Sequence, residues 1–205
     1  MPVDLEKLLA PGDVAVVIME VQRGIVGDRS GLPQLREAAE QVGLFDHLRR
    51  LNEGARRAGV PVVHHIKGPE AVPSAPPLYP GGAAMAKRKG DMDAHDMEAA
   101  HGVPRLPGDI VVERHHGVSA FTGTELDSVL RRLDVHTVVA AGVSLNVGIL
   151  TLAAEAVSRG YRTVVASDAV VGVPVDFGLA VLDNAIPFLA TRLTTDEIVA
   201  IWDRH

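Results

Sequence analysis

Polar side chains suited to proton transfer stand directly after short apolar runs of this chain. They combine a carboxyl group, an amide, imidazoles and a Gly-containing turn, which are groups that move protons or hold a small ligand. In chain order they are Glu20, Gln22, His64, His65, His115, His116 and residues 144–148. The sequence contains no cysteine, which excludes a thiol nucleophile, a disulfide and a cysteine-ligated metal.

The elements that must position these groups alternate between apolar runs and amphipathic stretches. Such alternation predicts a three-layer α/β/α fold with a mainly parallel, doubly wound sheet. The expected strands are residues 13–19, 61–66, 109–114, 137–141, 162–167 and, at an edge, 191–194. The expected helices are residues 33–58 with an interruption near 43, then 124–133, 145–159, 175–190 and 195–202. We expect residues 14–19, 109–114 and 137–141 to be central strands covered on both faces.

In an open parallel sheet the ligand lies beyond the carboxyl ends of the strands, where the strand order reverses. The polar residues above all follow predicted strands, so this rule places them at one edge. Two helix starts carry the spacing of a capping box, Thr122 with Glu125 and Thr194 with Glu197.

Residues 67–108 show no period and are rich in Pro and Gly. We expect a long loop insertion there, with a short helix near residues 95–100, that either covers the site or is inert. The basic run 87–89 is typical of a solvated face, although over a pocket it would attract a carboxylate.

Length and charge limit the class of protein. The 205 residues are 47% hydrophobic and 22% charged, which predicts one domain spanning 1–205. With 20 Lys and Arg against 26 Asp and Glu, the net charge of −6 predicts neither nucleic acid nor an anionic membrane as partner. No nucleotide-binding glycine motif, targeting segment or long apolar stretch is visible, so we expect a cytoplasmic protein without a nucleotide cofactor.

Several segments resemble the isochorismatase-like hydrolases. Residues 17–22 place an acid two residues before a Gln, residues 115–126 contain Ser119-Ala120-Phe121, and residues 141–150 resemble the family's nucleophile turn; the match continues through 153–170. The resemblance implies a three-layer α/β fold, a homo-oligomer (dimer or tetramer) and a non-proline cis peptide at Val143-Ser144.

The cysteine hydrolases of this family use an Asp, a Lys and a Cys, which fall here on Glu20, His115 and Gly148. Gly148 excludes a covalent cysteine adduct. The branch that cleaves a vinyl ether also has Gly at this position, and its chemistry needs an acid and a water rather than a nucleophile. Glu20 could supply that proton if burial favours its neutral form.

His115 has two readings: as a cation it would hold the acid and the substrate, and as a neutral imidazole it would act as a base. The register leaves Arg114, His115 and His116 as candidates for the family's Lys. His116 either bonds a loop carbonyl or touches the substrate.

The resemblance and the sheet rule together predict a set of substrate-binding residues: Gln22, His65, His116, Phe121, Val143, Ser144 and Leu145. A metal site is weighed because the chain has nine His, and the possible ligands are His64, His65, Asp91, Asp93, His95, His101, His115 and His116. Adjacent strand residues face opposite sides, so His64 and His65 cannot share a site. No metal and no cofactor are predicted.

The sequence therefore predicts acid-assisted hydrolysis of a small molecule, such as an enol ether or a secondary-metabolism intermediate, without a covalent intermediate. The alternative is a catalytically silent family member that binds a small ligand or serves as an assembly partner. Whether Glu20 and His115 converge in one dry pocket separates the two.

Overall fold

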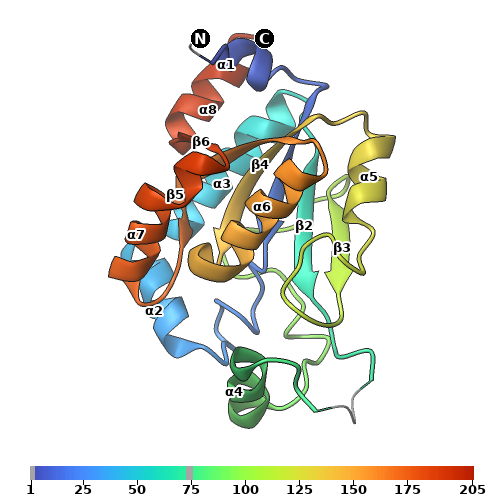
Figure 1. Ribbon diagram of the computed structural model, residues 1–205, viewed down its shortest axis with the longest axis vertical. Helices are drawn as coiled ribbons and strands as arrows, with labels where there is room; N and C mark the ends of the chain where they lie inside the picture. The colour runs from blue at the N-terminus through green and yellow to red at the C-terminus, as the bar shows by residue number, and fades with distance from the viewer. Residues whose placement is uncertain (1–2, 73–75) are drawn as a thin grey trace.

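Six parallel strands form one sheet in the computed structural model, which describes residues 3–72 and 76–205 (Figure 1). The spatial order is β3-β2-β1-β4-β5-β6. In chain order the strands are β1 Val14–Met19, β2 Val62–Lys67, β3 Ile110–Arg114, β4 Thr137–Val143, β5 Arg162–Val171 and β6 Thr191–Leu193. The order reverses between β1 and β4, which confirms the doubly wound parallel sheet and sets its ligand crevice beside β1.

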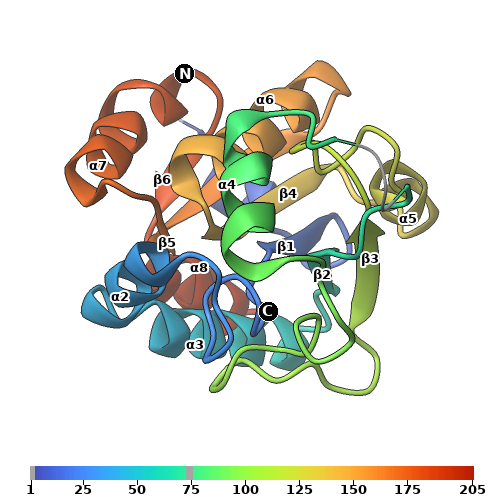
Figure 2. The ribbon, with the colours of Figure 1, turned by 90° about the horizontal axis from the view of Figure 1, so that it is seen from below.

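Helices cover both faces of the sheet (Figure 2). One layer holds α1 Leu5–Leu8, α2 Pro33–Gln41, α3 Leu44–Arg57 and α8 Thr195–Trp202. The other holds α5 Leu126–Arg132, the π-helical turn η1 Leu145–Ile149, α6 Leu150–Ser158, α7 Val175–Asn184 and the 3₁₀ turn η2 Ile186–Phe188. Strand β1 is buried throughout, with Val16 in one apolar core and Val17 in the other. A continuous apolar run fits such a doubly covered strand.

The expected central position of residues 109–114 is wrong, because β3 lies at the edge of the sheet. Its burial alternates, and the Val111 side of the strand is open, with that residue 44% exposed. Only three consecutive apolar residues, 110–112, occur in this strand. Such a short run is compatible with either a central or an edge strand, so the sequence pattern does not distinguish these two positions.

Helix boundaries match part of the expectation. The interruption near residue 43 is confirmed, since Gly43 adopts φ 67° between α2 and α3, a backbone region that favours glycine. The capping box of Thr194 with Glu197 is also confirmed. The one at Thr122 is wrong: α5 begins only at Leu126, and the Thr122 N–H donates instead to the Ser119 hydroxyl at 2.6 Å.

The segment 67–108 contains a helix that the sequence did not predict, α4 Pro80–Lys89. It lies beyond the carboxyl ends of the strands, across the site edge of the sheet (Figures 1 and 2). The helix begins at Pro80 and ends before Gly90. Gly81 and Gly82, which disfavour helix, make its start look like a loop in the sequence. The helix expected near 95–100 is absent; those residues form turns and a bridge from Ala99 to Gln22. Among the described residues no helix is long and apolar enough to cross a membrane.

Candidate active site

A pocket of about 190 Å³ opens at the carboxyl ends of the central strands, under α4. The polar side chains at its wall are Glu20, Lys67, Tyr79, Arg114 and Ser144, and the backbone of Gly148 also lines it. They come from the ends of β1, β2 and β3, from the turn after β4 and from the residue before α4. The crevice that the strand order predicts is therefore the place where these side chains meet.

Glu20 follows β1 in a left-handed backbone conformation, with φ 51°. Its N–H donates to the His65 carbonyl at 2.8 Å, which ties this turn to β2. A non-glycine residue in this region costs on the order of 1–3 kcal/mol, and such residues cluster at functional sites. The turn places the Glu20 side chain in the pocket, where it is only 17% exposed.

Arg114 is the cation that pairs with Glu20. Its side chain is 4% exposed and also donates to the carbonyls of His116, at 3.3 Å, and Gly117. Burial alone would lower the pKa of Arg114, but the charge of Glu20 and its hydrogen bond outweigh burial and raise it. The guanidinium therefore stays charged and compensates the charge of a Glu20 carboxylate in a setting of low dielectric.

His115 lies outside this pocket. Its Nδ1 is 2.9 Å from the Pro69 carbonyl oxygen, its Nε2 is 3.7 Å from a Glu113 carboxylate oxygen, and its side chain is 41% exposed. Of the three candidates for the family's Lys, the geometry thus favours Arg114 over His115. The sequence named Arg114 only as an alternative register, because Ser119-Ala120-Phe121 aligns the Lys with residue 115.

The turn after β4 forms the floor of the pocket. A side chain at Gly142, whose φ is 100°, would place its Cβ in steric clash with the Met19 carbonyl oxygen, so only glycine lets β4 approach β1 here. The cis peptide at Val143-Ser144 is confirmed. At Gly148 a Cβ would lie 3.1 Å from the Val143 carbonyl oxygen, so a small side chain fits there with a slight shift.

Two wall residues, Lys67 and Tyr79, come from the segment 67–108 and are not among the predicted site residues. The Lys67 ammonium donates to the Gly68 carbonyl at 3.0 Å and to Glu70 at 2.7 Å. Burial raises the pKa of Tyr79, and the nearby Arg114 charge opposes that shift. No periodicity or motif marks Tyr79, so the sequence offered no signal for it.

Several predicted substrate-binding residues are parts of the scaffold. Gln22 is fully buried: its amide donates to the Lys67 carbonyl at 2.9 Å and its oxygen accepts from the Lys67 N–H at 2.8 Å. Phe121 stacks on Tyr161 with ring centroids 5.9 Å apart. Val143 and Leu145 are buried beneath the turn, while Ser144 faces the pocket.

The neighbouring histidines His64 and His65 lie in different environments, His64 beside Asp109 and His65 near Glu20. The His64 Nε2 lies 3.1 Å from an Asp109 carboxylate oxygen. His65 is fully buried near Glu20, and neither ring nitrogen has a hydrogen-bond partner within the described residues. Burial lowers the pKa of each imidazole to about 4, so both are neutral at pH 7. Within residues 3–72 and 76–205, no three His, Asp or Glu side chains are grouped to hold a metal ion.

His116 and the basic run lie at the margin of the site. His116 lines an adjoining hollow, beside Gly117 and on the other side of Tyr79 from the pocket. Lys87 and Arg88 are exposed on α4, and Lys89 pairs with Asp96 at 2.7 Å. Lys89 therefore helps to anchor α4, whereas Lys87 and Arg88 are exposed to solvent.

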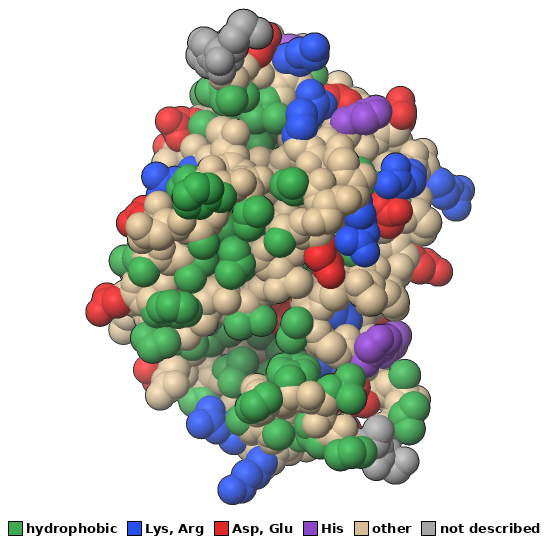
Figure 3. Space-filling model, viewed as in Figure 1, with side chains coloured by type: hydrophobic (Ala, Val, Ile, Leu, Met, Phe, Trp, Pro, Cys, Tyr) green, Lys and Arg blue, Asp and Glu red, His purple; other side chains and the backbone are tan. Residues whose placement is uncertain are grey.

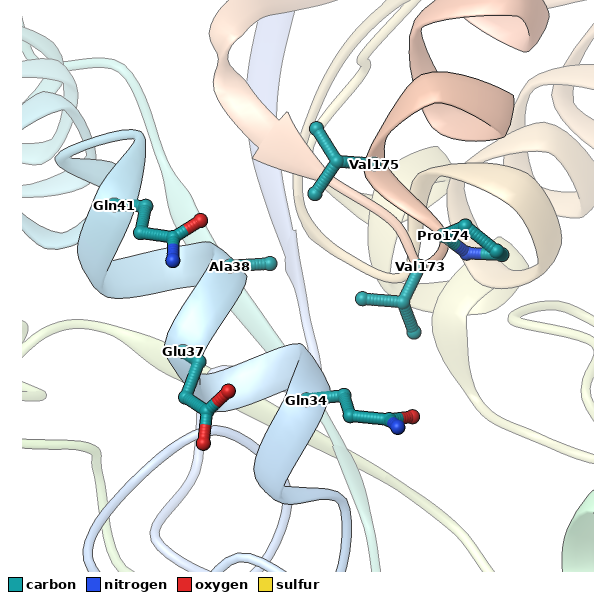
Figure 4. A pocket seen from close by; sticks show the side chains of 7 residues that line it. All are labelled: Gln34, Glu37, Ala38, Gln41, Val173, Pro174 and Val175. Atoms are coloured by element: carbon teal, nitrogen blue, oxygen red, sulfur yellow. The ribbon is translucent and has the colours of Figure 1, made fainter.

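A pocket of about 350 Å³ lies elsewhere, between α2 and the segment that leads into α7 (Figure 4). Its described lining carries one ionisable side chain, Glu37. In the part of the chain that the structure describes, the pocket under α4 brings together the acid, the cation and the glycine turn, and it is thus the candidate active site.

The three-layer α/β fold, with an acid, a cation and the glycine turn after β4 at the carboxyl edge of the sheet, matches what the resemblance to isochorismatase-like hydrolases predicts. The model of the isochorismatase domain matches residues 14–197, and the chain belongs to the isochorismatase family. An uncharacterised isochorismatase family protein of Bacillus subtilis, YwoC, is 30% identical over 186 residues, covering 90% of this chain and 92% of the relative.

Solved structures share the fold. A cysteine hydrolase from Pseudomonas syringae pv. phaseolicola superposes with a TM-score of 0.82 at 22% identity, over 96% of this chain and 95% of that chain. The N-carbamoylsarcosine amidase of Thermoplasma acidophilum has a TM-score of 0.67 at 27% identity, over 90% of this chain and 97% of its own.

Proposed function

We propose that this protein hydrolyses a small molecule by proton transfer through Glu20, with Arg114 as its cationic partner and without a covalent intermediate. The observation that carries the proposal is the Glu20–Arg114 pair, which faces a pocket floored by Gly148. The chain has no cysteine, which excludes a covalent thiol adduct, and in the proposed reaction water attacks the substrate directly.

Cleavage of an enol ether fits these groups. Glu20 donates a proton to the enol carbon, and the double bond becomes an oxocarbenium ion. Water adds to that cation and loses a proton to the Glu20 carboxylate, which regenerates the acid. The resulting hemiketal passes its hydroxyl proton to the ether oxygen as it collapses to an alcohol and a carbonyl compound. A substrate oxygen that accepts from Arg114 replaces part of the Glu20–Arg114 contact and lies beside the Glu20 carboxyl group.

Ligand binding without turnover is the second candidate. The observation that favours it is that Glu20 and Arg114 are already bonded to each other, and Arg114 also to two carbonyl oxygens. A site whose acid and cation satisfy one another can hold a ligand above the pair without reacting.

A thermal-shift screen followed by product analysis separates the two candidates. Enol ethers, carboxylic acids and amides of low molecular mass are tested, because a ligand of the native state raises the melting temperature. Each compound that stabilises the protein is incubated with it and analysed by mass spectrometry. Hydrolysis products support the enzyme; stabilisation without any product supports the binding protein.

We also propose that the protein is a homo-oligomer, a dimer or a tetramer. Large apolar side chains are exposed on and beside α7: Phe177 is 56% exposed, Leu179 52% and Phe188 88%. Hydrophobic side chains also gather on the face around α6 and α7 in Figure 3. Such patches mark contact surfaces. Light scattering on the eluted protein should give a multiple of the chain mass, and a monomer would contradict this assignment.

A further inference from the structure

The candidate active site continues beyond Tyr79. A second hollow of about 420 Å³ lies between α4 and the residues that precede it, and Tyr79 lines both spaces. Ligand pockets usually measure ~300–1,000 Å³. The inner pocket, at about 190 Å³, is below that range, whereas the outer hollow lies within it. The inner pocket suits the reacting part of a ligand, and the outer hollow can hold the remainder.

The outer hollow is mainly apolar. Its lining includes Val72, Pro76, Pro77, Leu78 and Ala86. Leu78 is 74% exposed and Val72 59%, which is costly for a surface that nothing covers. Figure 3 shows hydrophobic side chains gathered around α4.

The charged groups of the hollow select against an anion. Glu70 and Asp91 both line it, and both also line a narrow cleft of about 60 Å³ beside it, together with Lys67. Lys67 already pairs with Glu70. An acidic group placed in the hollow would therefore meet the Asp91 carboxylate, which has no salt-bridge partner among the described residues, whereas a neutral apolar group would meet no such repulsion.

Tyr79 forms the partition between the two spaces. Its ring lies against the first turn of α4, where a Cβ would be 3.3 Å from the ring at Gly81 and 3.1 Å at Gly82. The two glycines leave room for the ring at this place. On the inner side, the Arg114 charge acts on the Tyr79 hydroxyl.

We propose that the substrate is an amphiphile with a neutral apolar tail. Its hydrolysable polar head lies at Glu20 and Arg114, and an alkyl chain or an aryl ring passes Tyr79 into the outer hollow. The inference rests on the proposed function, since it assigns a substrate class to the same site. It makes short polar compounds, and compounds with an acidic group on the tail, poor ligands.

Binding of linear primary amides, measured by ligand-observed NMR titration, tests the tail site. Acetamide, butyramide and hexanamide share a neutral head that can accept from Arg114 and donate to Glu20. Each methylene buried in the hollow should tighten binding about fourfold, so hexanamide should bind about 15-fold more tightly than butyramide. Equal dissociation constants for the three amides would overturn the proposal.

Substitutions on α4 locate the tail. Ala86 lines the hollow, and Ala83 on the same helix is exposed and lines none of these spaces. Ala86→Trp should abolish the gain from butyramide to hexanamide and leave acetamide binding unchanged, while Ala83→Trp should preserve the gain. Equal behaviour of the two variants would place the tail elsewhere.

Leu78→Asp provides a second variant that does not depend on α4. It adds a charge to the lining at an exposed position, so it should weaken hexanamide at least tenfold and leave acetamide unchanged; unaltered hexanamide binding would contradict the proposal. None of these measurements requires turnover. If Glu20 has no catalytic role, the chain-length dependence persists, so the two proposals fail separately.

Discussion

Replacing Arg114 by Met should destabilise the protein far more than replacing His115 by Ala. Arg114 is 4% exposed and bonds Glu20, so its removal leaves a largely buried carboxylate without its counter-charge. Breaking such a pair by removing one partner costs ~3–5 kcal/mol. Glu20 keeps 17% exposure and can recover some hydration, so we expect the lower end, about 3 kcal/mol.

For a chain of this length, 1 kcal/mol lowers the melting temperature by ~2–4 °C. Arg114→Met should therefore lower it by about 6–12 °C. His115 is 41% exposed; its ring makes one hydrogen bond, with the Pro69 carbonyl, and lies 3.7 Å from an exposed Glu113 carboxylate oxygen. Such a hydrogen bond contributes ~1 kcal/mol or less, so His115→Ala should lower the melting temperature by no more than ~4 °C.

Differential scanning calorimetry at pH 7 measures both changes. The double variant Glu20→Gln with Arg114→Met tests the origin of the effect, because it leaves no uncompensated charge and should regain more than ~1 kcal/mol over Arg114→Met alone. The reasoning is refuted if His115→Ala destabilises as much as Arg114→Met, or if the double variant is no more stable than Arg114→Met.

Two further predictions concern the neighbours of the pair. Burial lowers the pKa values of His64 and His65 in the folded protein to about 4. The unfolded chain therefore binds protons at these residues near pH 6.5, whereas the folded chain does not. As a result, the free energy of unfolding should fall as the pH drops from about 6.5 to 4. Each His contributes up to about 3 kcal/mol to that fall. His65→Phe should flatten the slope in urea unfolding at pH 7.5 to 4.5, and the exposed His101→Gln should not; equal slopes in wild type and His65→Phe would contradict the assignment. Gly148→Cys should fold, since a Cβ there needs only a slight shift, and iodoacetamide should label its single thiol. It should not become an efficient amidase, because in the proposed site Glu20 and Arg114 stand where the resemblance expects an Asp and a Lys; rapid amide hydrolysis by this variant would show that account of the triad to be mistaken.

The sheet could be predicted from the sequence because its signals are local. The continuous apolar run of β1 fits a doubly covered strand, and the capping box of α8 is a pattern of four residues. The edge position of β3 was missed because three apolar residues in a row are compatible with either a central or an edge strand. Strand order depends on pairing across the sheet, which the sequence pattern does not record.

The candidate site could be predicted only where a motif or a strand end marks it. Glu20, Ser144 and Gly148 follow strands at the predicted edge, and all three line the pocket. The predicted cation, His115, is one residue away from Arg114, which lines the pocket. Adjacent side chains along a strand point to opposite faces, so an error of one residue in register selects the wrong side chain. Tyr79 and the apolar hollow depend on how residues 67–72 and 76–108 pack over the edge of the sheet, which no local pattern encodes.

The turnover number of Glu20→Gln tests the central claim most directly, on the compound that the product screen identifies. Gln keeps the shape and the hydrogen-bonding capacity of Glu20 but carries no transferable proton. We predict that kcat falls ~10²–10⁴-fold, the usual contribution of a positioned acid or base, while the dissociation constant of the substrate changes little. A Glu20→Gln variant with the kcat of the wild type would contradict the role of Glu20 and the proposed mechanism with it.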